Sequence, residues 1–453
     1  MTSALRPSAG PDRSDAALAG ERLLRLAGPA LGRRLDPGAV SPICVGFSGG
    51  SDSLALLLLA KAWAGQTGRP ILVLTVDHCL QPASGAWTAR AGQIASALGL
   101  SFRALPWLGP KPASGLPAAA RRARHALLAD AARAAGAQVL LLGHTADDLI
   151  EAELMREAGS SVGAPREWSP SPVWPEGRGV FLLRPLLGLR RAELRAMLAE
   201  AGWDWLEDPA NEDMRYARAR ARISLTSAYP GEGRDPGAAL TPAVSNKESL
   251  GPGLRRDERD WGGDSGGIIS LTRSAASDPR LLAMACVCAG GTEKLPRGKR
   301  AQRLAARIGT GERFTATLAG ARVEAGEAVQ VMRDAGRARS ELRLQPGAPA
   351  VWDGRFLVRA ERRGVIVRRL QGCSTALPHG ERQALRSLLP HARAALPLFQ
   401  HEQGVTCPIL AGSGWADAVS LTGERFAGAC GRIAREHDLA RGSDGGRQNG
   451  ALS

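Results

Sequence analysis

The residues best suited to chemistry in this chain form one short polar loop near the N-terminus. In order they are Ser48, Gly49, Gly50, Ser51, Asp52 and Ser53. The two glycines let the backbone approach an anion closely, and the three serines offer hydroxyl donors. Asp52 adds a carboxylate of the kind that binds Mg²⁺. The pattern predicts a loop that holds a phosphate chain together with its metal ion.

Apolar segments on both sides of the loop indicate how it would be held. Ile43 to Phe47 predicts a short buried strand, and Leu54 to Ala64, apolar except for Lys61, predicts a buried helix. Backbone N–H groups would gather at the helix N-terminus, where the helix dipole favours a phosphate. The alternative is a plain Ser/Gly turn in which a serine or Asp52 only caps the helix. A lysine-bearing P-loop is excluded because the motif G-x-x-x-x-G-K-[ST] is absent.

Further strands and helices alternate along the chain after this loop. Strands are predicted at Ile71 to Asp77, Ser101 to Leu105 and Val139 to Leu142. Helices are predicted at Ala16 to Leu31, Trp87 to Leu98 and Leu116 to Ala134, and in a last stretch that follows Asp148 and runs through Met155. The alternation predicts an α/β fold, a doubly wound parallel sheet with its ligand site at the carboxyl ends of the strands. Ser48, Asp77 and His144 each follow a predicted strand, so we expect all three to face one crevice.

Six blocks of the sequence resemble, in order and spacing, those of the tRNA(Ile)-lysidine synthases, which are PP-loop ATP pyrophosphatases. The blocks are Ser48 to Ser53, Val76 to His78, Ala120 to His125, Gly143 to Glu151, Arg184 to Leu187 with Arg190 and Glu193, and Trp205 to Asp213 with Tyr216, Arg218, Arg220 and Arg222. The chain departs from the family pattern at Thr145, Leu149 and Ala152, which replace a His, a Gln and a Thr, and at His125, which replaces a Tyr. Both acids of the fourth block, its first His and its Glu are kept.

The resemblance implies a fold like that of the adenine nucleotide alpha hydrolases and an ATP-dependent reaction. Members of the family adenylate the wobble cytidine of the CAU-anticodon isoleucine tRNA and release pyrophosphate. They then replace AMP with the ε-amino group of free L-lysine. The implied partners of this chain are therefore ATP, Mg²⁺, that tRNA and L-lysine.

Roles in the first step follow from the same resemblance. The loop and Asp77 would bind ATP, with Asp52 and Asp148 as ligands of Mg²⁺. His144 would donate a hydrogen bond to a phosphate oxygen or to the cytidine oxygen. Helix capping is the alternative role for Asp148 and its neighbour Asp147.

The second step requires a neutral amine, although free lysine is protonated near pH 7. Asp77 or Glu151 would orient that amine and accept its proton, and the sequence does not choose between them. Contacts to RNA or nucleotide phosphates are expected from Arg124, Arg218, Arg220 and Arg222. The last three alternate with alanines, so an extended segment would present them on one side, for phosphates or merely for solvent.

The composition favours a polyanionic partner. The chain has 59 Lys and Arg against 44 Asp and Glu, a net charge of +15, which points to nucleic acid. Only 4% of residues are aromatic, which argues against base stacking as the main mode of binding. The seven cysteines form no C-x-x-C pair, which disfavours a zinc ribbon or an iron–sulfur site. No apolar span reaches membrane length, so we expect a cytoplasmic protein that does not contact a membrane.

Two other functions stay open at this level. One is a different PP-loop tRNA-modifying ligase, although the missing C-x-x-C pairs disfavour a thiolating enzyme. The other is a non-catalytic RNA-binding paralogue that has kept the scaffold and lost its dependence on ATP. A homodimer is compatible with each function, because two subunits could share one extended tRNA.

Composition and periodicity divide the chain into six stretches. Residues 1–15 predict a flexible tail, 16–223 a PP-loop catalytic domain, 224–267 a linker or long loop, 268–340 a helical tRNA-binding domain, 341–440 a small α+β C-terminal domain, and 441–453 a disordered tail. Helices are expected at Leu271 to Ala289, Lys299 to Ile308 and Glu381 to Ala394, and strands at Phe314 to Leu318, Ala328 to Met332, Phe356 to Ala360 and Gly364 to Leu370. A basic helix side with Arg300, Arg303 and Arg307 is a candidate contact for the tRNA backbone.

Overall fold

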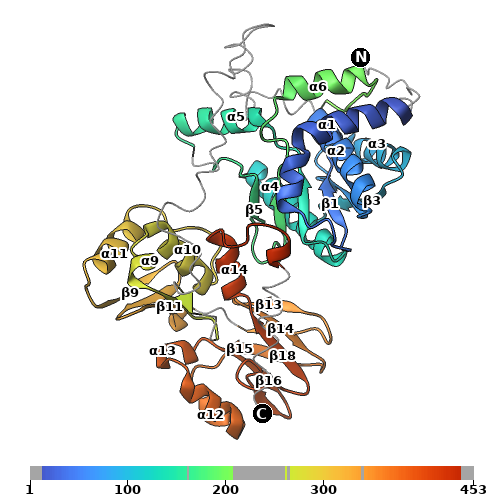
Figure 1. Cartoon of the computed structure of the whole chain (residues 1–453). Helices are drawn as coiled ribbons and strands as arrows, with labels where there is room; N and C mark the ends of the chain where they lie inside the picture. Colours follow the sequence, from blue (N-terminus) through green and yellow to red (C-terminus); the bar gives the residue numbers. More distant parts are fainter. Residues whose placement is uncertain (1–12, 161–162, 208–260, 263–265, 338–340, 440–453) are drawn as a thin grey trace. The chain divides into compact units, whose positions relative to one another are not determined.

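The computed structural model of the 453-residue chain describes residues 13–160, 163–207, 261–262, 266–337 and 341–439 (Figure 1). The chain divides into two compact units. The N-terminal unit comprises Met1–Asn246 together with Ala434–Leu439, and the C-terminal unit comprises Lys247–Ile433 and Ala440–Ser453. Each unit has its own sheets and its own buried core.

A six-stranded sheet forms the centre of the N-terminal unit. Its strands are β1 (Ile43–Gly46), β2 (Ile71–Asp77), β3 (Ser101–Pro106), β4 (Val139–Leu142), β5 (Trp168–Pro170) and β6 (Phe181–Leu183). Their order is β3-β2-β1-β4-β6-β5, and every pair is parallel except β5 with β6. The doubly wound parallel sheet predicted from the sequence is confirmed, with an antiparallel edge strand added.

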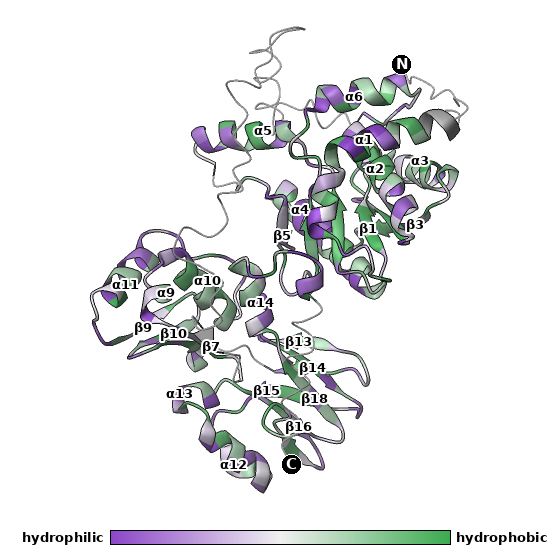
Figure 2. Ribbon diagram, in the orientation of Figure 1, coloured by the Kyte–Doolittle hydropathy of each residue, from purple (hydrophilic) through white to green (hydrophobic). Residues whose placement is uncertain are grey.

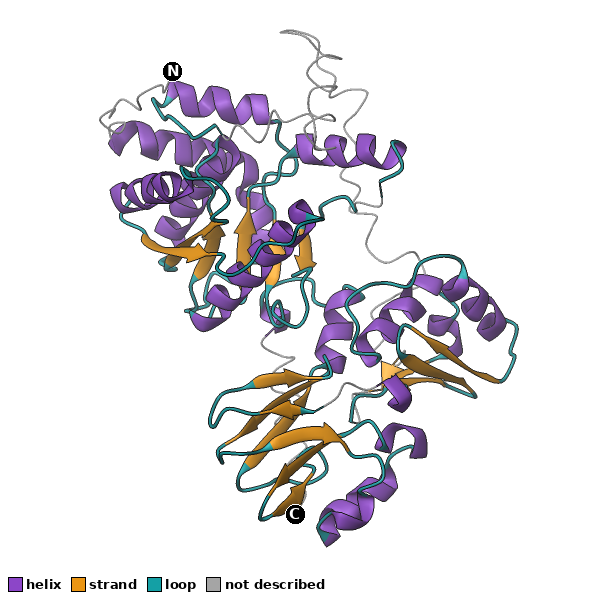
Figure 3. Cartoon of the chain, turned by 180° about the vertical axis from the view of Figure 1, so that it is seen from behind, coloured by secondary structure: helices purple, strands orange, loops and turns teal. Residues whose placement is uncertain are grey.

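Helices cover this sheet, whose strands lie between them in Figure 3. They are α1 (Arg13–Arg34), α2 (Ser51–Thr67), α3 (Ser84–Ala97), α4 (Leu116–Ala134), α5 (Ala146–Glu157) and α6 (Arg191–Glu200). Residues 54–60 of α2 are all buried, because α1 packs on one side of α2 and the sheet on the other. The strands of the sheet are correspondingly hydrophobic in Figure 2. A helix apolar on all sides is stable only in such a sandwiched position.

The C-terminal unit begins with a five-stranded antiparallel sheet packed against three helices. The strands, in sheet order, are β7 (Trp261–Gly262), β8 (Ile269–Leu271), β11 (Val329–Arg333), β10 (Ala321–Ala325) and β9 (Phe314–Leu318). The helices are α9 (Arg273–Ala276), α10 (Pro279–Ala289) and α11 (Arg300–Gly309). Their apolar faces share one core with the sheet. The stretch predicted as a helical domain therefore contains a sheet as well.

The remainder of this unit contains two smaller antiparallel sheets. One has the order β12 (Leu342–Arg343), β15 (Ile366–Arg369), β16 (Pro397–His401) and β17 (Gly404–Thr406), and the other β13 (Ala350–Trp352), β14 (Phe356–Ala360) and β18 (Ala416–Ser420). Helices α12 (His379–Ser387), α13 (Pro390–Arg393) and α14 (Thr422–Ala429) complete it. Large side chains of both sheets, such as Trp352, Phe356 and Phe399, share a second core.

Two helices expected in this unit are broken where the sequence predicted continuity. In the stretch from Leu271 to Ala289, the first residue is the last of strand β8, and the rest forms two helices, α9 and α10. The helices are separate because Asp278 caps a new helix that begins at Pro279. The stretch from Glu381 to Ala394 is interrupted before Pro390, which lacks the amide that a continuous helix needs. The apolar periodicity of the sequence continues across both breaks. In each case a new helix begins at a proline, Pro279 or Pro390.

Across the described parts of the chain, no helix combines the length and the apolar character needed to cross a bilayer.

Candidate active site

The Ser48–Ser53 loop joins β1 to α2 and is closed by its own side chains. The Ser53 hydroxyl donates to the carbonyl oxygen of Gly50 at 2.9 Å, and the Ser48 amide donates to the Ser53 hydroxyl at 3.2 Å. Gly50 is the N-cap of α2, and no side chain caps this helix. The alternative in which Asp52 serves only as a cap is therefore wrong. The amides at this helix N-terminus remain a place for an anion.

Two glycines make the close packing around this loop possible. Gly49 has a φ of 85°, and a Cβ there would lie 2.6 Å from Cδ1 of Leu206, whose amide donates to the Gly49 carbonyl at 2.9 Å. A Cβ on Gly143, after β4, would lie 2.9 Å from the carbonyl oxygen of Asp52. The β4–α5 turn and the segment near Leu206 thus both rest directly on the loop.

Arg191, the first residue of α6, lies among the acidic residues of the site. Its Nε donates to Oδ2 of Asp52 at 2.8 Å, and its Nη1 donates to Oε1 of Glu151 at 3.2 Å. Its Nη2 lies 3.8 Å from Oδ2 of Asp148. Burial opposes the charge on Arg191, but the carboxylates, Asp52 foremost, outweigh burial and raise its pKa. Three sequence-predicted acids thus converge on one guanidinium that the sequence analysis did not single out.

Asp147 and Asp148 are adjacent in the chain and have different partners. Asp147 accepts from the backbone amide of Arg191 at 2.7 Å and from the Arg190 side chain. Burial acts to raise the pKa of Asp147, but these hydrogen bonds hold it below its usual range. Asp148 accepts from the Thr145 amide at 2.8 Å and so caps α5. The capping alternative thus holds for Asp148, which also faces Arg191.

His144 follows β4 and is held by a buried arginine. The Nε of Arg184 donates to Nδ1 of His144 at 3.2 Å. Because a guanidinium can only donate, Nδ1 must carry the lone pair, and the ring proton lies on Nε2. Burial, with the charges of Arg121 and Arg124 on α4, lowers the pKa of Arg184 to about 10, so it remains charged at neutral pH. His144 therefore has a fixed tautomer with Nε2–H as its donor.

His125 lies on the buried face of α4, close to this pair. Arg184 and His144 both lie near enough to act electrostatically on His125. It is 1% exposed, and burial together with Arg124 and Arg121 lowers its pKa to about 2. Arg124, predicted to contact phosphates, is thus part of a cationic group at the edge of the site.

Asp77 ends β2, one strand away from the loop. Its Oδ1 accepts from the Cys79 amide at 2.8 Å. Burial acts to raise its pKa, but the hydrogen bonds from Cys79 and from the Ser84 hydroxyl lower it below the usual value. The side chain of Asp77 thus bonds within its own turn and with the start of α3. Arg218, Arg220 and Arg222 lie outside the described residues.

The sequence analysis missed Arg191, Arg195 and Leu206 as parts of the site. Arg195 lies one turn after Arg191 on α6, and its Nε donates to the Ser51 hydroxyl at 3.3 Å. The i, i+4 spacing of Arg191 and Arg195 indicates that both lie on one face of a helix, and this was the only sign of them in the sequence. Their relation to the loop depends on the packing of α6 on α2, which local pattern does not show.

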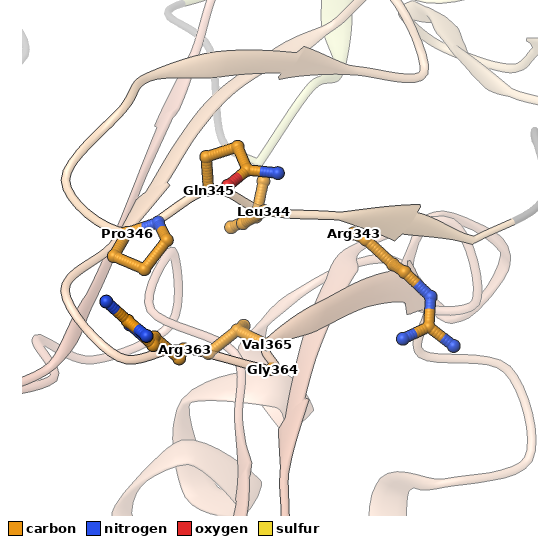
Figure 4. A pocket seen from close by; sticks show the side chains of 7 residues that line it. All are labelled: Arg343, Leu344, Gln345, Pro346, Arg363, Gly364 and Val365. Atoms are coloured by element: carbon orange, nitrogen blue, oxygen red, sulfur yellow. The ribbon is translucent and has the colours of Figure 1, made fainter.

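A separate cavity of about 530 Å³ lies in the C-terminal unit (Figure 4). Its lining consists of Arg343, Leu344, Gln345, Pro346, Arg363, Gly364 and Val365. Arg343 ends β12 and Arg363 lies in the turn before β15, so two guanidinium groups, and no carboxylate of the described residues, line it.

Comparison with known proteins decides the family. A model described as the PP-loop domain matches residues 30–229. The tRNA(Ile)-lysidine synthase of Caulobacter vibrioides is 49% identical over 418 residues, which cover 90% of this chain and 97% of that protein. The chain belongs to the tRNA(Ile)-lysidine synthases. The synthases of Hyphomonas neptunium and Mesorhizobium japonicum are 39% and 35% identical, over 65% and 70% of this chain and 82% and 71% of their own lengths.

As a tRNA(Ile)-lysidine synthase, the chain is a ligase with an ATP-binding PP-loop domain. The family resemblance drawn from the six sequence blocks is thereby confirmed. The Mg²⁺ that the family resemblance implies suits the donors present, since Mg²⁺ commonly takes one or two carboxylates and completes its shell with phosphates. Asp52 and Asp148, both close to Arg191, are the two carboxylates that would hold it. Within the described residues, no three or more His, Cys, Asp or Glu form a group that could hold a metal ion.

Proposed function

We propose that this enzyme ligates L-lysine to C2 of the wobble cytidine of the CAU-anticodon isoleucine tRNA. In the first step the cytidine oxygen attacks the α-phosphate of ATP, and pyrophosphate leaves. In the second step the ε-amino group of lysine attacks C2, and AMP leaves. The modified base would read AUA in place of AUG. The observation that carries the proposal is the uncapped α2 N-terminus beside Asp52, Asp148, Glu151 and His144.

The loop would hold the departing pyrophosphate. Its amides at the N-terminus of α2, the Ser48 hydroxyl and the guanidinium of Arg195 are donors near one place. Asp52 and Asp148 would bind Mg²⁺, which when bound neutralises charge on the phosphates. Positioning and charge stabilisation of this kind supply most of the catalysis in phosphoryl-type transfer.

His144 would stabilise the oxygen that gains charge. Its Nε2–H is fixed as a donor by the Arg184 hydrogen bond to Nδ1. The donor needs no rearrangement at the moment of reaction, which is the condition for effective electrostatic catalysis. Arg124, on α4 near Arg184, would contact a phosphate of the nucleotide or the RNA.

Glu151 is the better candidate to orient the lysine amine. It shares the Arg191 guanidinium with Asp52, whereas the side chain of Asp77 bonds within its own turn and with Ser84 of α3. A carboxylate within the cluster can accept the proton that the ammonium must lose before attack. Asp77, at the end of the neighbouring strand, would then contribute to binding ATP.

The C-terminal unit would grip the body of the tRNA. Arg300 and Arg303 are exposed on α11, whose opposite face is buried, and Arg307 is held by an ion pair with Glu312. Arg343 and Arg363 border the cavity of Figure 4 with no competing carboxylate in its lining. Arginines spaced in this way suit the phosphates of an RNA backbone.

Pyrophosphate release from ATP tests the proposal. The purified protein would be given an unmodified CAU-anticodon isoleucine tRNA transcript and L-lysine, separately and together. We expect tRNA-dependent release, with lysine incorporated at the wobble cytidine only when both are present. Incorporation of another amine would indicate a different PP-loop ligase. Intact ATP with bound tRNA would indicate a non-catalytic RNA-binding protein.

A further inference from the structure

The Arg191 side chain lies among the carboxylates that a metal ion would need as ligands. The Arg191 side chain is 15% exposed, and its guanidinium has one carboxylate near each nitrogen: Asp52 at Nε, Glu151 at Nη1 and Asp148 at Nη2. Those acids are the ones proposed for the metal and the amine. One cation of the chain itself thus occupies the middle of the acidic cluster.

Both oxygens of Asp52 are already engaged in this arrangement. Oδ2 accepts from Nε of Arg191 at 2.8 Å, and Oδ1 accepts from the Ser51 hydroxyl at 3.2 Å. Mg²⁺ binds oxygen ligands at about 2.0–2.1 Å, so an ion at Asp52 would lie within a few ångströms of the Arg191 guanidinium. Because the two cations repel each other, metal binding at Asp52 favours release of the Arg191 side chain.

The backbone of Arg191 is anchored independently of its side chain. Its amide donates to Oδ2 of Asp147 at 2.7 Å, and Asp147 is itself held by Arg190. Arg195, one turn on, contacts Ser51 from the same face of α6. A side chain that leaves Asp52 would consequently swing about a fixed point and stay beside the loop, where a pyrophosphate would lie.

We propose that Arg191 is an internal counter-cation that holds Asp52, Glu151 and Asp148 together and is displaced from Asp52 when metal and nucleotide bind. The inference rests on the proposed metal role of Asp52 and Asp148. Arg191 is a positioning residue in this scheme. Without it, the three carboxylates would repel one another, and their negative charge would attract a divalent cation more strongly.

Mn²⁺ binding without nucleotide, followed by the electron paramagnetic resonance of free Mn²⁺, tests the inference. We expect Arg191→Gln to bind Mn²⁺ about tenfold or more tightly than wild type, because removing a cation a few ångströms from the ligands favours another cation. Arg191→Lys keeps the charge and should bind Mn²⁺ as wild type does. Arg195→Gln is the matched control, since it removes a guanidinium from the same helix face that contacts Ser51 and no acid of the cluster.

Thermal unfolding gives a second readout that a purely structural ion pair would not move. Arg191→Gln should unfold at a lower temperature than wild type without metal and recover when Mg²⁺ is added, whereas wild type without nucleotide should not respond to Mg²⁺. Unchanged Mn²⁺ affinity in Arg191→Gln, or destabilisation that Mg²⁺ leaves untouched, would overturn the inference. If Arg191→Gln does not fold, Arg191→Lys decides it by the same two measurements, since a marked change in its Mn²⁺ affinity contradicts the counter-cation role.

The metal role itself is tested separately by Mn²⁺–ATP binding to Asp52→Asn. If that variant binds Mn²⁺–ATP as wild type does, the proposed metal site fails and the inference with it. If Asp52→Asn loses Mn²⁺–ATP while Arg191→Gln binds Mn²⁺ as wild type does, only the counter-cation role fails.

Discussion

At the scale of single residues, Asp52 links three parts of the site. Its backbone touches the β4–α5 turn, and its carboxylate reaches Arg191 on α6 and Ser51 in the loop. A carboxylate that caps a helix would instead accept from the first backbone amides of that helix. The environment of Asp52 is therefore suited to binding a cation beside a phosphate.

Asp52→Asn should bind the tRNA normally and lose pyrophosphate release by about 100-fold or more, because an amide cannot replace the charge that binds the metal. Filter binding of the tRNA and pyrophosphate release from ATP measure the two effects. Glu153→Gln, which alters an exposed acid on α5, is the control and should stay active. Near-normal turnover in Asp52→Asn would remove Asp52 from the metal site.

His125 predicts a pH dependence of stability. Neither ring nitrogen has a hydrogen-bond partner among the described residues, and the pKa of His125 is lowered to about 2, far below the value in an unfolded chain. The unfolded state therefore binds a proton below about pH 6.5 that the folded state refuses, so stability is lost as the pH falls. Between pH 7 and pH 5 the loss due to this one group is about 2 kcal/mol.

His125→Phe removes the group that titrates while keeping a ring of similar shape. When the pH is lowered from 7 to 5, wild type should lose about 2 kcal/mol more of its free energy of unfolding than His125→Phe does. Urea unfolding at the two pH values measures this difference. An equal loss of stability in both proteins would show that His125 is protonated in the folded state.

At the scale of elements, the site depends on turns that approach each other closely. The turn after β4 rests on the N-terminus of α2 at Gly143, where even one methyl group would meet the Asp52 carbonyl at 2.9 Å. That contact lies between residues about ninety positions apart in the sequence. Gly143 does not have the positive φ that favours glycine. Glycine is needed there because one element packs closely on another.

Gly143→Ala should push the β4–α5 turn away from the loop and displace His144 and Asp148. We expect kcat/KM for ATP to fall by about tenfold or more, since small misplacements of catalytic groups are costly. Gly188→Ala is a matched control, because a Cβ there has nothing within 4 Å. If the two variants have equal activity, the turn tolerates the shift and the close contact has no functional weight.

At the scale of the whole molecule, a segment late in the chain, Ala434–Leu439, is built into the N-terminal unit. Glu436 accepts two hydrogen bonds from Arg69, at 2.6 and 2.8 Å, and the two side chains are 4% and 1% exposed. The Glu436 amide donates to the Arg34 carbonyl at 2.8 Å. Segment Ala434–Leu439 therefore belongs to the fold that forms the active site, although the sequence analysis grouped it with the residues before it.

Glu436→Gln should destabilise the protein by about 3–5 kcal/mol, because it leaves the Arg69 charge buried without its partner. Chemical unfolding followed by circular dichroism measures the loss. The control is Glu200→Gln, which breaks an exposed ion pair with Arg22 and should change stability by less than about 1 kcal/mol. Equal effects of the two substitutions would contradict a structural role for the returning segment.

Apolar periodicity and the short motif from Ser48 to Ser53 were enough to predict β1 to β4, α1 to α5 and the loop, because these local signals act between residues close together in the chain. They did not predict β5, β6 or α6. The same local signals failed at Pro279 and Pro390, where apolar spacing continued across a helix boundary.

Only the tertiary structure decided which charges meet. Arg191 reaches Asp52 across 139 positions, and Arg69 reaches Glu436 across 367. One arginine of such a chain looks like another in the sequence, because its ordinary place is a solvated surface. What distinguishes these two is that packing brings each beside carboxylates and removes most of the water around it, and that depends on the fold of the whole unit.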